Sequence, residues 1–168
     1  RHRSSGSSRG GIITLARSDF NNLAFIENSK TDERSWHYLS MDPDTILLGN
    51  WYRPGSSDHD AFSELQEDMQ RLMIGATGCF IGGGLNIHHA RWLRYSSGNT
   101  SQGADLKIVC ESFGLQQIVR EPTRQQYLLD LVLTDIADTK VKVGSYIADH
   151  KMVSAEIPVP SISSLQIK

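Results

Sequence analysis

Apolar positions recur along this chain with two different periods, and each period predicts its own kind of element. Short apolar stretches rich in β-branched and aromatic residues predict strands, over residues 12–16, 35–39, 45–52, 78–83, 127–134, 140–145 and 148–157. Apolar residues at helical spacing predict amphipathic helices over residues 58–73 and 104–113. Because strands outnumber helices and long helices interrupt them, the pattern predicts a layered α/β sandwich and not a pure barrel.

The first predicted helix has recognisable ends. Ser57 precedes it as the expected N-cap, and Gly75 follows its last apolar residues as the expected stop. Asp58, Asp60 and Glu64 place negative charge in its first turns, where the helix dipole favours it. These signals agree with the apolar period and strengthen the prediction of a helix here.

The composition fits an ordinary globular domain and gives no general attraction for nucleic acid. The chain has 168 residues, of which 39% are hydrophobic and 21% charged, so a single hydrophobic core is expected. Its net charge of -2 leaves only local basic patches to attract DNA or RNA. Cys79 and Cys110 are isolated in apolar stretches, which argues against a disulfide scaffold or a Cys-based zinc site and favours a reducing compartment.

The two ends of the chain differ from its middle. Residues 1–11 are rich in Ser, Gly and Arg, so a flexible basic arm is expected there, followed by one domain over 12–158 and a tail over 159–168. No run reaches the roughly 18 apolar residues that a membrane span needs, and the start lacks the apolar segment of a secretory signal. The first residue is Arg, so we expect a processed chain or a piece of a longer one.

Polar side chains gather where predicted strands end, which is where layered α/β folds usually place their chemistry. Four clusters have this position. They are Trp51-Tyr52-Arg53-Pro54, the run from Gly82 to His89, Asp130 inside the apolar YLLDLVLT, and Asp149-His150.

Asp130 needs a partner, because an unpaired charge inside an apolar strand costs several kcal/mol. His150 is the natural candidate, since an Asp that accepts from one imidazole nitrogen fixes the tautomer and leaves the other nitrogen to face a substrate. The alternative is a structural Asp130 that caps neighbouring backbone, with His150 on the surface.

The glycine run does not match the nucleotide-binding motifs. No Lys-Ser or Lys-Thr follows it, as a phosphate loop requires, and Ile87 stands where a dinucleotide fingerprint needs its third glycine. His88 and His89 are adjacent, so they point to opposite sides of an extended chain and would not chelate zinc together.

The order of these clusters resembles the endonuclease domain of non-LTR retrotransposons, a branch of the exonuclease-endonuclease-phosphatase superfamily. The matching segments are GGIITLAR, ERSW, WYRP, DAFSELQEDMQRL, GGGLNIHHARW, ADLKIVCESFGL with LQQIVREPTR, LLDLVLTD and ADH. The match extends from about Gly10 to the last predicted strand. The resemblance implies two packed β-sheets flanked by helices, and nothing before Gly10 resembles the family's opening strand, so the domain is expected to be N-terminally incomplete.

The resemblance implies a phosphodiesterase that depends on a divalent metal, usually Mg²⁺, held by carboxylate oxygens. It assigns Tyr52 to contact with the phosphate, and Asn86 to the orientation of phosphate and nucleophile. Asp130 matches the acid that orients the imidazole. Asp149 and His150 match the terminal Asp-His pair, in which Asp149 is the metal-binding acid and His150 contacts the phosphate.

Three arginines lie near these motifs: Arg91, Arg94 and Arg124. They are candidates for contacts to flanking phosphates, and solvated surface arginines are the alternative. The resemblance further implies DNA as the partner, a reverse transcriptase in the parent polypeptide, and an intracellular, nuclear location.

Two departures from the family pattern predict weak or absent cleavage. Gly84 stands where the family has the aspartate that handles the attacking water, and loss of a general base usually lowers the rate by ~10²- to 10⁴-fold. The family's opening asparagine and metal-binding glutamate have no counterpart before Gly10. We therefore expect a degenerate endonuclease copy. The alternatives are a non-catalytic nucleic-acid- or protein-binding module and a small-molecule phosphatase of the same superfamily.

Overall fold

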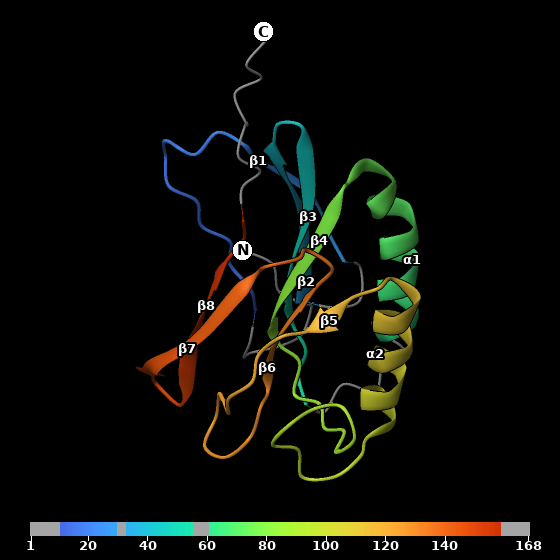
Figure 1. Ribbon diagram of the computed structural model, residues 1–168, viewed down its shortest axis with the longest axis vertical. Helices are drawn as coiled ribbons and strands as arrows, with labels where there is room; N and C mark the ends of the chain where they lie inside the picture. The colour runs from blue at the N-terminus through green and yellow to red at the C-terminus, as the bar shows by residue number, and fades with distance from the viewer. Residues whose placement is uncertain (1–10, 30–32, 56–60, 159–168) are drawn as a thin grey trace, which may run out of the picture.

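The computed structural model describes residues 11–29, 33–55 and 61–158 (Figure 1). Within these ranges the main sheet has six strands and a second sheet has two. In spatial order the main sheet contains β1 (Leu23–Asn28), β2 (Glu33–Met41), β3 (Asp44–Tyr52), β4 (Gly78–Gly84), β6 (Asp130–Thr134) and β5 (Gln116–Gln117). The second sheet pairs β7 (Lys140–Ile147) with β8 (His150–Glu156).

Two helices cover one face of the main sheet, and the β7–β8 hairpin lies on its other side (Figure 1). Strands β3 and β4 are parallel, whereas the other paired strands are antiparallel. Parallel neighbours need a crossover, and helix α1 (Ala61–Leu72) with the short 3-10 helix η1 (Met73–Gly75) lies between them in the chain. Helix α2 (Ser101–Ser112) follows β4 and packs beside α1.

The hydrophobic core lies between the helices and the sheet. Phe62, Leu65 and Met69 on the inner face of α1 are buried against the fully buried rings of Trp36 and Trp51. Their spacing along α1 follows the helical period, which is why the apolar pattern predicted this helix.

A buried ionic network joins β2 to α1. Arg34 has no solvent exposure, and its guanidinium donates to the Asp68 carboxylate at 3.0 Å. The same carboxylate accepts from the Trp36 indole at 2.8 Å and from Arg71 at 3.0 Å. Several donors thus compensate a carboxylate that would be costly to bury alone.

The predicted layered α/β architecture and both predicted helices are confirmed, with shifted ends. The prediction of a strand over residues 12–16 is wrong: only Ile12 forms a β-bridge, and Leu15 is 81% exposed. This segment is held instead by the Asn50 side-chain amide, which donates to the carbonyl of Ile13 and to the hydroxyl of Thr14.

Three further boundaries differ from prediction. The strand expected over 127–134 begins at Asp130, because Arg124 and Tyr127 close a turn just before it. The last strand begins at His150, because Ala148 adopts φ 60° in the hairpin turn. Helix α2 begins at Ser101, because the Thr100 hydroxyl caps it by accepting the N–H of Gly103.

Strands β1 and β5 were not predicted from the apolar pattern. Gly75 ends η1 as expected, whereas the proposed N-cap Ser57, the basic arm up to residue 10 and the tail from residue 159 lie outside the described residues. Neither helix of the described chain has both the length and the apolar character that crossing a lipid bilayer requires.

Candidate active site

The predicted site residues converge where several strands begin or end. β3 ends at Tyr52 and β4 ends at Gly84, while the antiparallel β6 begins at Asp130. Gly84 pairs directly with Asp130 in the register of the sheet. Strand β8 of the second sheet begins at His150, which reaches Asp130 from the other side. Residues far apart in the sequence therefore meet at one end of the sheet.

Asp130 and His150 form a hydrogen-bonded pair. His150 Nδ1 lies 2.7 Å from Asp130 Oδ2, and the side chains are 32% and 22% exposed for His150 and Asp130, respectively. A carboxylate at Nδ1 favours the tautomer protonated there and directs Nε2 away from the acid. The pair can therefore present Nε2 to a substrate.

Thr123 fixes the main chain under this pair. It is fully buried, and its hydroxyl oxygen accepts the N–H groups of Leu129 at 3.1 Å and Asp130 at 3.0 Å. Its carbonyl accepts the N–H of Lys151, next to His150, at 2.7 Å. Thr123 was not singled out as a site residue, although its place in the Pro-Thr-Arg segment of the resemblance was a usable signal.

Gly84 occupies the space between Tyr52 and Asp130. A Cβ built at Gly84 would lie 3.1 Å from Asp130 Oδ1 and 3.7 Å from Tyr52 Cδ2. The position at which the resemblance expects a catalytic aspartate therefore faces the Asp130 carboxylate and carries no side chain.

Asn86 is held beside the end of β3. Its amide Nδ2 donates to the carbonyl of Arg53 at 2.7 Å, and the N–H of Arg53 donates to the carbonyl of Gly84 at 2.9 Å. Asn86 has φ 49°, a left-handed conformation that Asn adopts more readily than most residues. These contacts join the loops after β3 and β4 and bring Asn86 next to the residue that follows Tyr52.

Asp149 does not join this cluster through its carboxylate. Its side chain is 67% exposed and lies 2.8 Å from the Arg124 guanidinium. Arg91 and Arg94 are exposed on the loop after β4. The structure thus brings Tyr52, Asp130 and His150 together beside Gly84, whereas the Asn86 side chain is held by the carbonyl of Arg53. It pairs Asp149 with Arg124 and leaves Arg91 and Arg94 facing solvent.

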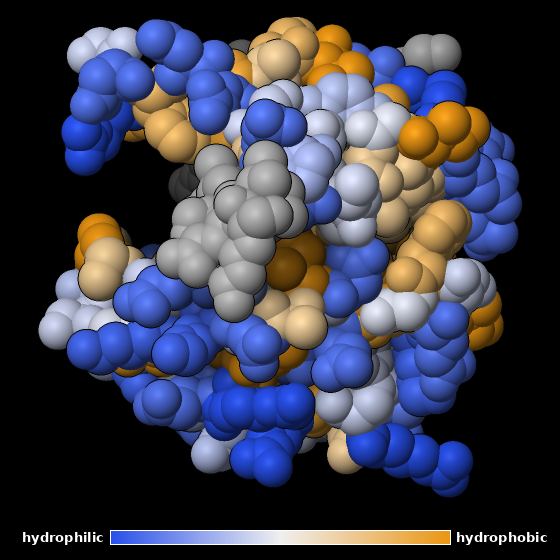
Figure 2. Space-filling view, turned by 45° about the horizontal axis from the view of Figure 1, so that its top comes forward, coloured by the Kyte–Doolittle hydropathy of each residue, from blue (hydrophilic) through white to orange (hydrophobic). Residues whose placement is uncertain are grey.

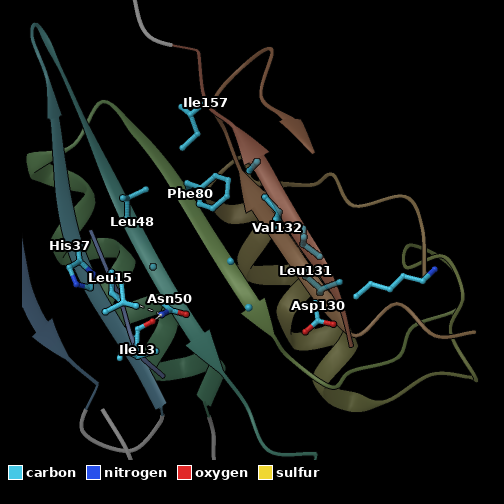
Figure 3. A pocket seen from close by; sticks show the side chains of 17 residues that line it. Ile13, Leu15, His37, Leu48, Asn50, Phe80, Asp130, Leu131, Val132 and Ile157 are labelled. Atoms are coloured by element: carbon cyan, nitrogen blue, oxygen red, sulfur yellow. Dashed lines mark hydrogen bonds between the residues drawn. The ribbon is translucent and has the colours of Figure 1, made fainter. Parts of the chain in front are cut away.

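A groove of about 610 Å³ runs from the site along the sheet face that the helices do not cover. Asp130 lies at one end and Ile157 at the other, with Leu48, Phe80 and Val132 between them (Figure 3). Figure 2 shows the surface notched on its left, on the side where Figure 1 places the first described residues and the β7–β8 hairpin. Most of the lining side chains are apolar, and the polar ones include His37, Asn50, Asp130 and Lys151.

The described side chains do not fit the divalent metal that the resemblance implies. They contain no group of three or more His, Cys, Asp or Glu residues that could hold an ion. The Asp130 carboxylate is engaged by His150, and that of Asp149 by Arg124. A hard cation requires several oxygen ligands at one point, and this part of the chain does not supply them.

Comparisons with known proteins place the fold. No protein-family model matches the chain, and no curated protein does. Among solved structures, the endonuclease domain of TRAS1, a telomere-specific non-LTR retrotransposon, has a TM-score of 0.67 at 16% identity, covering 83% of this chain and 71% of that one. The 3′ phosphatase NExo from Neisseria, bound to a product DNA hairpin, has a TM-score of 0.58 at 14% identity, covering 82% and 71%.

A mannosyl-6-phosphatase from Bacteroides thetaiotaomicron has a TM-score of 0.55 at 15% identity, covering 84% of this chain and 68% of that one. TM-scores of 0.55 to 0.67 establish a common fold, and identities of 14 to 16% leave the activity open. The arrangement of sheets and helices described above is therefore the exonuclease-endonuclease-phosphatase fold, the fold that this chain has in common with a retrotransposon endonuclease domain.

Proposed function

We propose that this chain is a DNA endonuclease domain of a retrotransposon, and that this copy hydrolyses phosphodiesters weakly or not at all. The observation that carries the proposal is the Asp130–His150 pair, 2.7 Å apart, beside Tyr52 and Gly84. The similarity in fold to the TRAS1 endonuclease domain supports DNA as the substrate.

Hydrolysis of a phosphodiester places specific demands on such a site. A water oxygen attacks phosphorus, the bond from phosphorus to the leaving sugar oxygen breaks, and a proton passes from the water to that leaving oxygen. In its imidazolium form, His150 donates from Nδ1 to Asp130 and from Nε2 to a phosphate oxygen. The resemblance also assigns the Tyr52 hydroxyl and the Asn86 side chain to the phosphate, and fixed donors of this kind stabilise its developing charge.

The step that this site is least equipped to perform is the removal of a proton from the attacking water. Gly84 stands at the position that the resemblance assigns to this task, and it has no group that can accept a proton. Loss of a general base lowers rates by roughly 10²- to 10⁴-fold. We derive no metal-dependent step, because the described carboxylates near the site are engaged by His150 and Arg124.

The parent polypeptide in this proposal includes a reverse transcriptase and lies in the nucleus, as the resemblance implies. The net charge of -2 sets a limit on affinity, so contact with DNA depends on local basic groups such as Arg91, Arg94 and Arg124.

The test is relaxation of supercoiled plasmid by the purified chain, with and without Mg²⁺, beside His150→Ala and Asn86→Ala. We expect little or no nicking by the wild type, together with measurable binding to duplex DNA at low salt. Robust nicking that both substitutions abolish would support an endonuclease and overturn the prediction that this copy is degenerate. Gly84→Asp should restore little alone, since one added carboxylate does not complete a metal site.

A second candidate is a non-catalytic module that binds nucleic acid on the same scaffold. The sheet is regular at Gly84, which pairs with Asp130, and this regular scaffold favours a binding module. DNA binding with no nicking in any variant would select this module. Hydrolysis of a phosphoinositide or phospholipid, with no binding to DNA, would instead indicate a small-molecule phosphatase.

A further inference from the structure

The loop after β4, residues 85–100, holds an aromatic ring in solvent beside the candidate site. Tyr95 is 49% exposed, whereas Trp92 of the same loop packs against the core and donates its indole N–H to the carbonyl of Gly103 at 3.0 Å. Tyr95 has φ 56°, a left-handed conformation that bulky residues rarely adopt because Cβ crowds the following carbonyl. The fold therefore holds Tyr95, with its exposed ring, in a backbone conformation that costs free energy.

Hydrogen bonds fix the main chain around this ring. The N–H of His89 donates to the Ser96 hydroxyl at 3.0 Å, and the carbonyl of Tyr95 accepts the N–H of Leu128 at 3.4 Å. Leu128 lies two residues before Asp130. The loop over 85–100 and the segment before β6 lie side by side in Figure 1, as these contacts require. Tyr95 is therefore tied to the segment that leads into β6, the strand of the candidate acid.

The charged residues of this loop are all basic. It contains Arg91 and Arg94, and no acidic residue occurs from Leu85 to Ala104. Both arginines are exposed, and within the described ranges the structure gives neither of them an ion pair. On a chain with a net charge of -2, this is a local positive surface suited to phosphate groups.

We propose that Tyr95 stacks on an unpaired base of DNA while Arg91 and Arg94 contact the flanking phosphates. The proposal rests on the proposed function and names its substrate: DNA with an unpaired or extruded base next to the phosphodiester at Asp130 and His150. A base inside a regular duplex has neighbours on both faces, whereas an unpaired base can turn one face to a protein ring. The half-exposed Tyr95 ring offers such a face.

The test is fluorescence anisotropy with a labelled duplex and with the same duplex carrying one unpaired base. The variants are Tyr95→Ala, Tyr95→Phe, which keeps the ring, and Phe25→Ala, which removes another exposed aromatic from β1, at the far edge of the sheet. Base stacking on an aromatic side chain predicts that Tyr95→Ala weakens binding to the DNA with the unpaired base by about 5- to 100-fold. Tyr95→Phe and Phe25→Ala should stay within about twofold of the wild type, since neither removes the stacking ring.

Salt titration separates stacking from phosphate contact. Tyr95→Ala should leave the slope of log K against log salt unchanged, whereas the double variant Arg91→Ala/Arg94→Ala should reduce its magnitude by roughly 2. Thermal unfolding of each variant checks that it is folded, and Tyr95→Phe tests the ring in a side chain of nearly the same shape.

The outcomes distinguish this proposal from the one on which it rests. Unchanged binding of Tyr95→Ala to the DNA with the unpaired base, with weaker binding of the arginine variant, would overturn stacking and leave the proposed function standing. Equal losses of Tyr95→Ala on both DNAs would also overturn it, because they would indicate a structural role. A wild-type chain that binds neither DNA at low salt would overturn both proposals.

Discussion

His150 and Asp130 are hydrogen-bonded across two different sheets. His150 is the first residue of β8 in the two-stranded sheet, and Asp130 is the first residue of β6 in the six-stranded sheet, with Nδ1 and Oδ2 2.7 Å apart. The relative position of the two sheets therefore decides whether the pair can form. Groups that hold the two strand starts together act on the site without touching a substrate, and Thr123 is the clearest of them.

Thr123→Val should destabilise the protein by about 1–3 kcal/mol, the usual cost of a buried donor left without an acceptor. The substitution removes the oxygen that accepts the N–H groups of Leu129 and Asp130. Urea unfolding measures the loss, and amide hydrogen exchange should show faster exchange at these two residues. Thr123→Ser keeps the hydroxyl and is the control. Equal stability of the Val variant and the wild type would show that the main chain here needs no such acceptor.

Asp68→Ala should lower the free energy of unfolding by about 1–3 kcal/mol, the cost of buried donors left without an acceptor, because Glu64 still lies 3.4 Å from Arg34 and compensates its charge. Arg34 has no solvent exposure and would lose the carboxylate that lies 3.0 Å away. The control is Glu67→Ala, an exposed position of the same helix, where we expect a change within about 0.5 kcal/mol. Chemical denaturation of the two variants compares them directly, and similar losses would argue against a specific role for the buried network.

Gly83→Ala should prevent stable folding. An added Cβ would lie 1.7 Å from the carbonyl oxygen of Trp51, and the backbone φ of 152° disfavours a side chain as well. Gly98→Ala separates the two effects, because Gly98 has φ 143° but no atom within 4 Å of the added Cβ. The Gly98 variant should lose only about 1–2 kcal/mol from the backbone conformation. Soluble yield and thermal unfolding report the difference, and a well-folded Gly83→Ala variant would contradict the close contact.

Stability should fall as the pH is lowered through the ordinary range of a histidine, in part because of His37. Burial lowers the pKa of His37 below its usual value of 6.5, so the unfolded chain takes up a proton more readily than the folded one. The free energy of unfolding therefore decreases as pH falls below about 6.5 and is regained as pH rises above it. Urea unfolding at pH 7.5 and pH 5.5 measures the effect, and it should shrink in His37→Gln. An identical pH dependence in that variant would exclude His37 as a source.

Much of the fold could be predicted from local pattern, because apolar periods report burial directly. Helix α1 and strands β2, β3 and β4 follow this rule. The strand expected over 12–16 is an exception, because its apolar residue Leu15 is exposed and not buried. Strand β1 has mostly exposed or half-buried residues, so it lacks the buried pattern on which such predictions depend.

The candidate site could be predicted in part. The cost of burying a lone carboxylate left two alternatives open, a pair with His150 and a structural Asp130 that caps backbone, and the structure has the pair. The contact of Asp149 with Arg124 could not be predicted, since it depends on how the turn before β6 meets the turn before β8. The left-handed conformation of Tyr95 also depends on tertiary contacts that no local pattern contains.

Gly84 remains a paired member of β4 in register with Asp130, although it lacks the side chain that the resemblance expects there. Ladder hydrogen bonds involve only main-chain atoms, so the pairing of Gly84 does not require the side chain that is missing there. Folding and any chemistry at this position therefore depend on different atoms of the same residue. Assays of stability alone would not detect the loss of a side chain here, and only an assay of activity would.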